Sequence, residues 1–214
     1  MLNSQPILYI GNSSQSTRKR TNSIEIHPLL CNELCNCGLP VFKTGSRAIA
    51  IQGWLRELGH ALGFDVWIAA NDQGRPFGTG QLGNGCLSQL PESLSQSPGA
   101  DAIRLIDVLW LDRSSREVVA AYEVEHTTSI YSGIVRMLDL ALGTPASATR
   151  GLFLVAPDSR EADVRAQLQR PAFRHVADLR VRFLPYSELE KHRESVARFG
   201  EGMKAMLAIS RSVE

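Results

Sequence analysis

The sequence lacks an excess of charge of either sign. It has 23 Lys and Arg residues against 22 Asp and Glu residues, which gives a formal net charge of +1. Domains that coat nucleic acid by charge alone are usually strongly basic, so this balance argues against that class but not against a locally basic groove. Lysine is scarce too, and nearly all the positive charge is arginine. Arginine suits bidentate contacts with phosphate, although a GC-rich genome would give the same bias.

Long apolar runs are also missing. No stretch approaches the roughly 18 to 20 apolar residues that a membrane-spanning helix needs, so we expect no contact with a membrane. The N-terminus shows neither the basic start nor the apolar segment of a secretory signal, and a cytoplasmic protein is expected. Apolar residues still make up 43% of the 214 residues, which excludes disorder as the main state and is enough for the core of one large domain.

Cysteine is limited to four residues, three of them clustered at Cys31, Cys35 and Cys37, with Cys86 apart. Structural disulfides are not expected in a cytoplasmic protein. The four thiolates could together bind zinc, but the spacing of the cluster differs from the usual pair of ligands two residues apart. The spacing therefore favours buried or incidental thiols, and zinc stays the less favoured interpretation.

The hydrophobic pattern divides the chain into an irregular N-terminal segment, residues 1–47, packed on a domain of residues 48–214. Apolar residues at helical spacing predict helices over residues 49–62, 128–142, 158–170 and 187–210, the last interrupted near Gly200 and Gly202. Short apolar runs predict strands over residues 64–70, 102–111, 117–126, 151–157 and 179–186. A glycine-rich loop with a short helical turn before Pro91 follows the first strand. The resulting order, α-β-β-β-α-β-α-β-α, is that of an α/β domain.

Three acidic residues lie in two neighbouring predicted strands. Asp107 lies between apolar residues of one, and Glu123 and Glu125 lie near the end of the next. Side chains two apart in a strand point to the same side, so the two glutamates project together; the other face is an apolar row of Val118, Ala120, Tyr122 and Val124. If the two strands pair as a hairpin, Asp107 lies beside both glutamates. Three such carboxylates need a cation, and Mg²⁺ prefers oxygen ligands.

This pattern resembles the PD-(D/E)XK nuclease superfamily, and within it the restriction-endonuclease-like proteins of bacterial defence loci. Asp107, then a turn, then Glu123-x-Glu125 looks like its acidic signature in a D…ExE variant. The helix and strand before the motif and the helix and strand after it match the superfamily's order, over roughly residues 49–156. The resemblance implies a restriction-endonuclease-like αβββαβ core with a mixed central sheet flanked by helices.

The same resemblance assigns roles to five residues. Asp107 and Glu123 would hold Mg²⁺ or Mn²⁺, with Glu57 on the first helix as a further ligand. Glu125 stands where the usual signature has lysine, so it would position or deprotonate the attacking water without supplying positive charge. Arg136, on the helix after the motif, would offer a positive charge to the scissile phosphate.

Four more residues are candidate contacts with nucleic acid. Asn71 and Arg75 lie in the glycine-rich loop, His126 follows the acidic pair, and Tyr131 lies on the helix after it. The loop could equally be an ordinary glycine-rich turn, and His126 could contact a carboxylate instead.

The catalytic candidates have structural interpretations as well. Asp107 could cap a loop at the end of a strand, and Glu123 and Glu125 could lie on the solvated face of an edge strand. Glu57 could be an ordinary exposed helix residue. Arg136 could be a surface or salt-bridge residue, which is the more frequent case for an arginine on a helix.

The resemblance implies a metal-dependent endonuclease that hydrolyses DNA phosphodiester bonds in bacterial restriction or defence. DNA is the expected partner, with a homodimer and a helicase or methylase partner as further possibilities. The alternative is a catalytically inactive nuclease-like fold that binds nucleic acid or protein, which the missing lysine and the near-neutral charge favour. A third interpretation, a glycosidase with two carboxylates, predicts activity without divalent metal.

Overall fold

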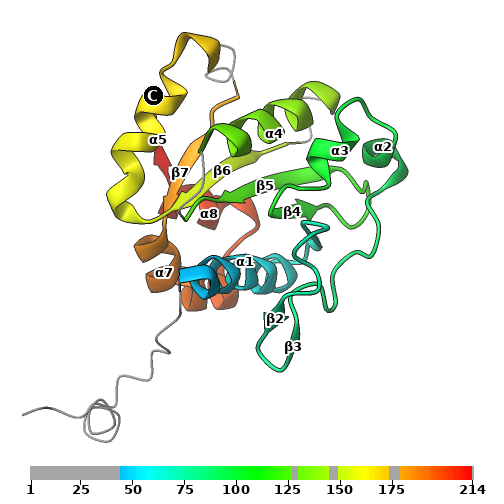
Figure 1. Ribbon diagram of the computed structural model, residues 1–214. Coiled ribbons are helices and arrows are strands. Elements are labelled where there is room, and N and C mark those ends of the chain that lie inside the picture. The colour runs from blue at the N-terminus through cyan, green and yellow to red at the C-terminus, as the bar shows by residue number, and fades with distance from the viewer. Residues whose placement is uncertain (1–43, 127–129, 145–148, 174–178, 214) are drawn as a thin grey trace, which may run out of the picture. The chain divides into compact units, whose positions relative to one another are not determined.

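The computed structural model describes residues 44–126, 130–144, 149–173 and 179–213 (Figure 1). All the described residues belong to one compact unit, Phe42–Glu214. The cysteine cluster and most of the segment expected over residues 1–47 therefore lie outside the described residues. The first helix, α1, spans Thr44–Ala61, so it begins before the boundary expected between residues 47 and 48.

A mixed six-stranded sheet forms the centre of this unit. Its strand order is β1-β4-β5-β6-β7-β8, and the strands are β1 (Asp65–Ile68), β4 (Val108–Leu111), β5 (Val118–Val124), β6 (Gly151–Ala156), β7 (Arg182–Pro185) and β8 (Arg211–Ser212). The first three are antiparallel, β5, β6 and β7 are parallel, and β8 is antiparallel to β7. The α/β class and the mixed sheet are as predicted, and so is the hairpin of β4 and β5.

Helices cover both faces of the sheet (Figure 1). One face packs against α4 (Ile130–Gly143), α5 (Glu161–Leu168) and the short α3 (Ala100–Ile103), and the other packs against α1, α7 (Tyr186–Phe199) and α8 (Met203–Ile209). The break between α7 and α8 falls at the predicted glycines, and Gly63 ends α1 with a left-handed φ of 86°. None of the helices in the described ranges is long and apolar enough to cross a membrane.

A β-bulge in the hairpin corrects one predicted face. The register passes from Trp110 opposite Ala120 to Leu111 opposite Val118, so one residue of β5 is skipped. Ala120, Tyr122 and Val124 pack toward α1 as predicted. Val118 packs instead against the α4 side, because the bulge reverses the alternation of the strand there.

The segment between β1 and β4 differs most from the prediction. The strand expected over residues 102–111 begins only at Val108, because residues 100–103 form α3. The short helix α2 (Glu92–Ser95) follows Pro91 rather than preceding it, and the glycine-rich loop contains a small hairpin of β2 (Pro76–Phe77) and β3 (Gly80–Gln81). The edge strand β8 was not predicted, since two residues give no periodic signal.

Substitution of Gly59 tests the contact between α1 and the sheet. An alanine Cβ there would lie 2.6 Å from Nε1 of Trp110 and 2.6 Å from Cγ2 of Val66, in a fully buried region. Gly59→Ala should lower the free energy of unfolding by about 1 to 3 kcal/mol, although alanine favours a helix by about 1 kcal/mol. Urea denaturation measures this. Gly74→Ala, with no atom within 4 Å of its Cβ, is the control; equal stability of both variants would contradict the packing.

Candidate functional site

The hairpin brings Asp107 to the same end of the sheet as Glu123. Asp107 directly precedes β4, and the register places Val108 opposite Tyr122, so Asp107 and Glu123 follow as the next pair. One oxygen of Asp107, Oδ2, accepts a hydrogen bond of 2.6 Å from the backbone N–H of Val124. Asp107 is therefore tied to the end of β5, as the hairpin prediction required, and it caps that strand end as well.

Glu123 is fully buried and paired with Arg136 of α4. The guanidinium donates from Nε to Oε1 at 2.8 Å and from Nη2 to Oε2 at 2.5 Å. This bidentate geometry is the strong form of an ion pair. Arg136 thus reaches the acidic cluster, and its structural interpretation as a salt-bridge residue is confirmed.

Glu125 lies one residue beyond β5 and is buried with Glu123 on the side that faces α4. Its backbone N–H donates to the carbonyl of Val155 at 2.8 Å, which continues the ladder between β5 and β6. A Cβ on Gly133 of α4 would lie 2.8 Å from Oε1 of Glu125 and 3.2 Å from Cβ of Glu123. Both glutamates are therefore packed under α4 on a central strand, and the alternative of a solvated edge strand is wrong.

Burial dominates the electrostatics of these carboxylates. It raises the pKa of Asp107 to about 7, against the opposing effects of the Val124 N–H and of Arg136. It raises the pKa of Glu123 to about 8, and the hydrogen bonds from Arg136 again act in the opposite direction. Glu125 raises both values by repulsion. The negative charge that gathers here is only partly compensated by the protein.

Gln52 of α1 also belongs to the site and was not predicted. Its side-chain Nε2 donates to Oδ1 of Asp107 at 3.0 Å and to Oδ2 of Asp72 at 3.1 Å. Its Oε1 is buried and has no hydrogen-bond partner among the described residues. A helical wheel would have identified Gln52, because it borders the buried stripe of Ile51 and Leu55.

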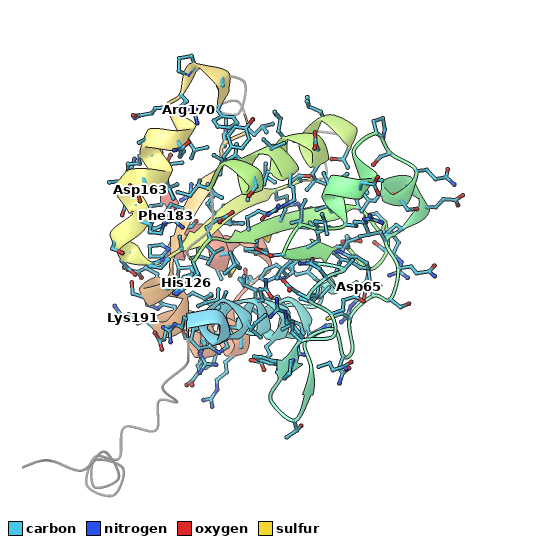
Figure 2. All side chains as sticks on the ribbon, in the orientation of Figure 1. Asp65, His126, Asp163, Arg170, Phe183 and Lys191 are labelled. Carbon is cyan, nitrogen blue, oxygen red and sulfur yellow. The ribbon has the colours of Figure 1, made fainter. Side chains whose placement is uncertain are left out.

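Tyr186, which was not predicted, forms a second part of the site together with the predicted candidate His126. Tyr186 begins α7, and its ring stacks on that of His126 with centroids 5.9 Å apart. Burial raises the pKa of Tyr186 well above its ordinary value, and the charges of Asp107 and Glu125 raise it further. The Tyr186 hydroxyl and Nδ1 of His126 are buried without a hydrogen-bond partner in the described part of the chain. Figure 2 labels His126 just beyond the end of β5, and labels Asp65, where β1 begins, at the opposite end of the sheet.

The remaining predicted residues lie apart from the carboxylates. Glu57 is exposed and lies 4.0 Å from Nη2 of Arg56, on the side of α1 that faces away from the buried stripe. The site therefore does not include it. Asn71 is exposed, Arg75 pairs with Asp72 at 3.3 Å, and Tyr131 is half-exposed against the ring of Phe173.

The donor set fits a hard divalent cation only in part. Carboxylate and amide oxygens are the ligands that Mg²⁺ prefers, and the unpartnered Oε1 of Gln52 and the raised pKa of Asp107 are features that a cation would relieve. Both oxygens of Glu123 are engaged by Arg136. Within the described ranges, no group of three or more His, Cys, Asp or Glu side chains is arranged to hold a metal ion.

Two comparisons with known proteins give matches. A family model described as the C-terminal domain of the type II restriction enzyme NmeDI matches residues 38–207. The type II restriction enzyme NmeDI of Neisseria meningitidis serogroup C is 33% identical to the chain over 150 residues, which are 68% of this chain and 42% of that relative. The chain thus spans less than half the length of the relative. No solved structure gives a significant match.

Asp107→Asn tests the electrostatic cost of the site. Because the pKa of Asp107 is raised in the folded state, the folded protein binds more protons than the unfolded chain between about pH 4 and pH 7, and its stability falls as the pH rises through that range. Asparagine removes this fall. The variant should gain about 3 kcal/mol relative to the native protein on going from pH 4 to pH 7 in EDTA, measured by urea denaturation.

The control for that experiment is Asp101→Asn. Asp101 is fully exposed, with 92% of its side-chain surface accessible. Its substitution should change the free energy of unfolding by less than about 0.5 kcal/mol, because the side chain is solvated. A stability difference for Asp107→Asn that does not change between pH 4 and pH 7 would contradict the raised pKa.

Proposed function

Because the chain belongs to the family of the C-terminal domain of the type II restriction enzyme NmeDI, we propose that it is a metal-dependent endonuclease that hydrolyses DNA phosphodiester bonds in bacterial restriction or defence. The observation that carries the proposal is the convergence of Asp107, Glu123 and Glu125 at one end of the β4–β5 hairpin. The order α1, β1, β4, β5, α4, β6 supports the αβββαβ core of the PD-(D/E)XK superfamily, in its D…ExE form.

Asp107 and Glu123 are the proposed ligands of Mg²⁺ or Mn²⁺. Such an ion would lower the pKa of a water molecule and stabilise the charge that develops on the phosphate. We leave Glu57 out of this set because its carboxylate is exposed and lies beside Arg56. Each oxygen of Glu123 accepts one hydrogen bond from Arg136, so Glu123 would bind the ion through the remaining lone pairs of these oxygens.

The chain's other residues at the site orient water and phosphate in this proposal. Glu125, buried and held under α4, orients the attacking water and accepts its proton. The Arg136 guanidinium exchanges one of its hydrogen bonds to Glu123 for one to the scissile phosphate, and so places its positive charge beside the phosphate. Arg75, Asn71 and Tyr131, all at least partly exposed, are the proposed contacts with the DNA backbone.

The assembly remains a proposal as well. Cutting both strands of a duplex needs two sites, so a homodimer is the arrangement we favour. The relative is more than twice as long as the matched region, so its activity as a whole protein need not reside in this part alone. A helicase or methylase partner would supply what such a part lacks.

One observation favours the second candidate, an inactive nuclease-like domain that binds nucleic acid or a protein. Arg136 engages both oxygens of Glu123, which is the arrangement expected if a permanent ion pair has replaced a metal site. The lysine of the usual signature is also replaced by Glu125. This candidate predicts binding without hydrolysis.

Cleavage of supercoiled plasmid and of single-stranded DNA with Mg²⁺, Mn²⁺ or EDTA separates the two candidates. We expect cutting that needs metal, that falls by about 100-fold or more in Asp107→Ala, and that persists in the matched control Glu57→Gln. Cutting that survives in Asp107→Ala, or that disappears in Glu57→Gln, would contradict the assigned site. Binding of DNA without cutting in any metal would favour the inactive domain.

A further inference from the structure

The amide of Gln52 connects the acidic cluster to the loop that follows β1. Its Nε2 donates to Asp107 at 3.0 Å and to Asp72 at 3.1 Å, so both hydrogens of the amide are used. The other oxygen of Asp72 forms an ion pair with Nε of Arg75 at 3.3 Å, and most of the Arg75 side chain is exposed. A continuous polar chain therefore runs from the surface at Arg75 through Asp72 and Gln52 to Asp107.

An uncharged hydrogen-bond donor suits the position between the carboxylates of Asp107 and Asp72. Gln52 lies between two carboxylates and is only 3% exposed. A glutamate there would add a third negative charge, and a lysine would cancel the charge that the proposed cation needs. The amide fixes both carboxylates without changing the charge of the site.

The carbonyl oxygen of the Gln52 amide, Oε1, indicates that a polar group lies beside it. A buried acceptor without a partner costs about 1 to 3 kcal/mol, and Oε1 of Gln52 is in that state. A water molecule beside the amide would supply the missing hydrogen bond.

We propose that Gln52 is a positioning residue, which holds the Asp107 carboxylate in its productive orientation and anchors it through Asp72 to the loop that carries Arg75. This inference rests on the proposed function for its kinetic consequences. Asp107 has only two anchors among the described residues, the Val124 N–H and the Gln52 amide, one on each oxygen. Loss of the amide leaves one oxygen without a partner and the carboxylate free to turn.

The kinetic test compares native protein with Gln52→Leu, which removes both donors at similar volume. We expect kcat for cleavage of a DNA duplex in Mg²⁺ to fall by about 10- to 100-fold, because a small misplacement of a catalytic group has effects of that size. KM for DNA should change little, and the thermal midpoint should fall by a few degrees because Asp107 and Asp72 each lose a donor. The matched control is Gln73→Leu in the same loop, whose amide donates to the carbonyl of Ile68 at 3.2 Å and not to the cluster.

Variants of Asp72 test the anchor itself. Asp72→Asn keeps an acceptor for Gln52 and should retain most of kcat, whereas Asp72→Leu should lose kcat as Gln52→Leu does. If Gln52 and Asp72 act through the same contacts, removing both side chains lowers kcat no more than removing Gln52 alone. The double variant Gln52→Leu/Asp72→Leu should therefore have the same kcat as Gln52→Leu. Losses that multiply in the double variant, or a parallel loss of stability and kcat in both Gln52→Leu and Gln73→Leu, would overturn the proposal.

A crystal structure of Gln52→Leu gives a result that does not depend on activity. The proposal expects the Asp107 carboxylate to be rotated away from the Val124 N–H or spread over several orientations. An Asp107 that keeps its native orientation in this variant would overturn the proposal even if activity fell. If the native protein cuts no DNA, the proposed function fails, but this structural comparison still decides the role of Gln52.

Discussion

Burial of negative charge at one end of the β4–β5 hairpin is the constraint on which the site depends. Isolated ionised carboxylates are not stable inside a protein, so they must be protonated, paired or bound to a cation. Among the described residues, Arg136 pairs its positive charge with Glu123, and Val124 and Gln52 donate neutral hydrogen bonds to Asp107. Burial still raises the pKa of Asp107 to about 7, so this compensation is incomplete.

The surrounding fold is arranged to keep that charge buried. Gly133 lets α4 approach the two glutamates closely, since even one Cβ would crowd Oε1 of Glu125. The antiparallel register of β4 and β5 places Asp107 on the neighbouring strand, and α1 approaches from the other side with Gln52. Such an arrangement is costly for stability alone, which is why a function that needs concentrated negative charge is the better explanation.

The elements that local patterns determine were predictable from the sequence, and those that depend on distant contacts were not. The hairpin and the pair Glu123 and Glu125 follow from alternation within single strands. Glu57 was predicted from the family resemblance, which expects an acidic residue on the first helix, but Glu57 is exposed and it is Gln52 that borders the buried stripe of α1. Tyr186 comes from a helix 61 residues after Glu125, and nothing local marks it.

The central claim is that the buried carboxylates form a cation site, and a calorimetric titration of the protein with Mn²⁺ in the absence of DNA tests it most directly. The account predicts binding by the native protein and by Glu57→Gln, and loss of binding in Asp107→Ala and Glu123→Gln. No binding by the native protein, or loss of binding in Glu57→Gln alone, would contradict it.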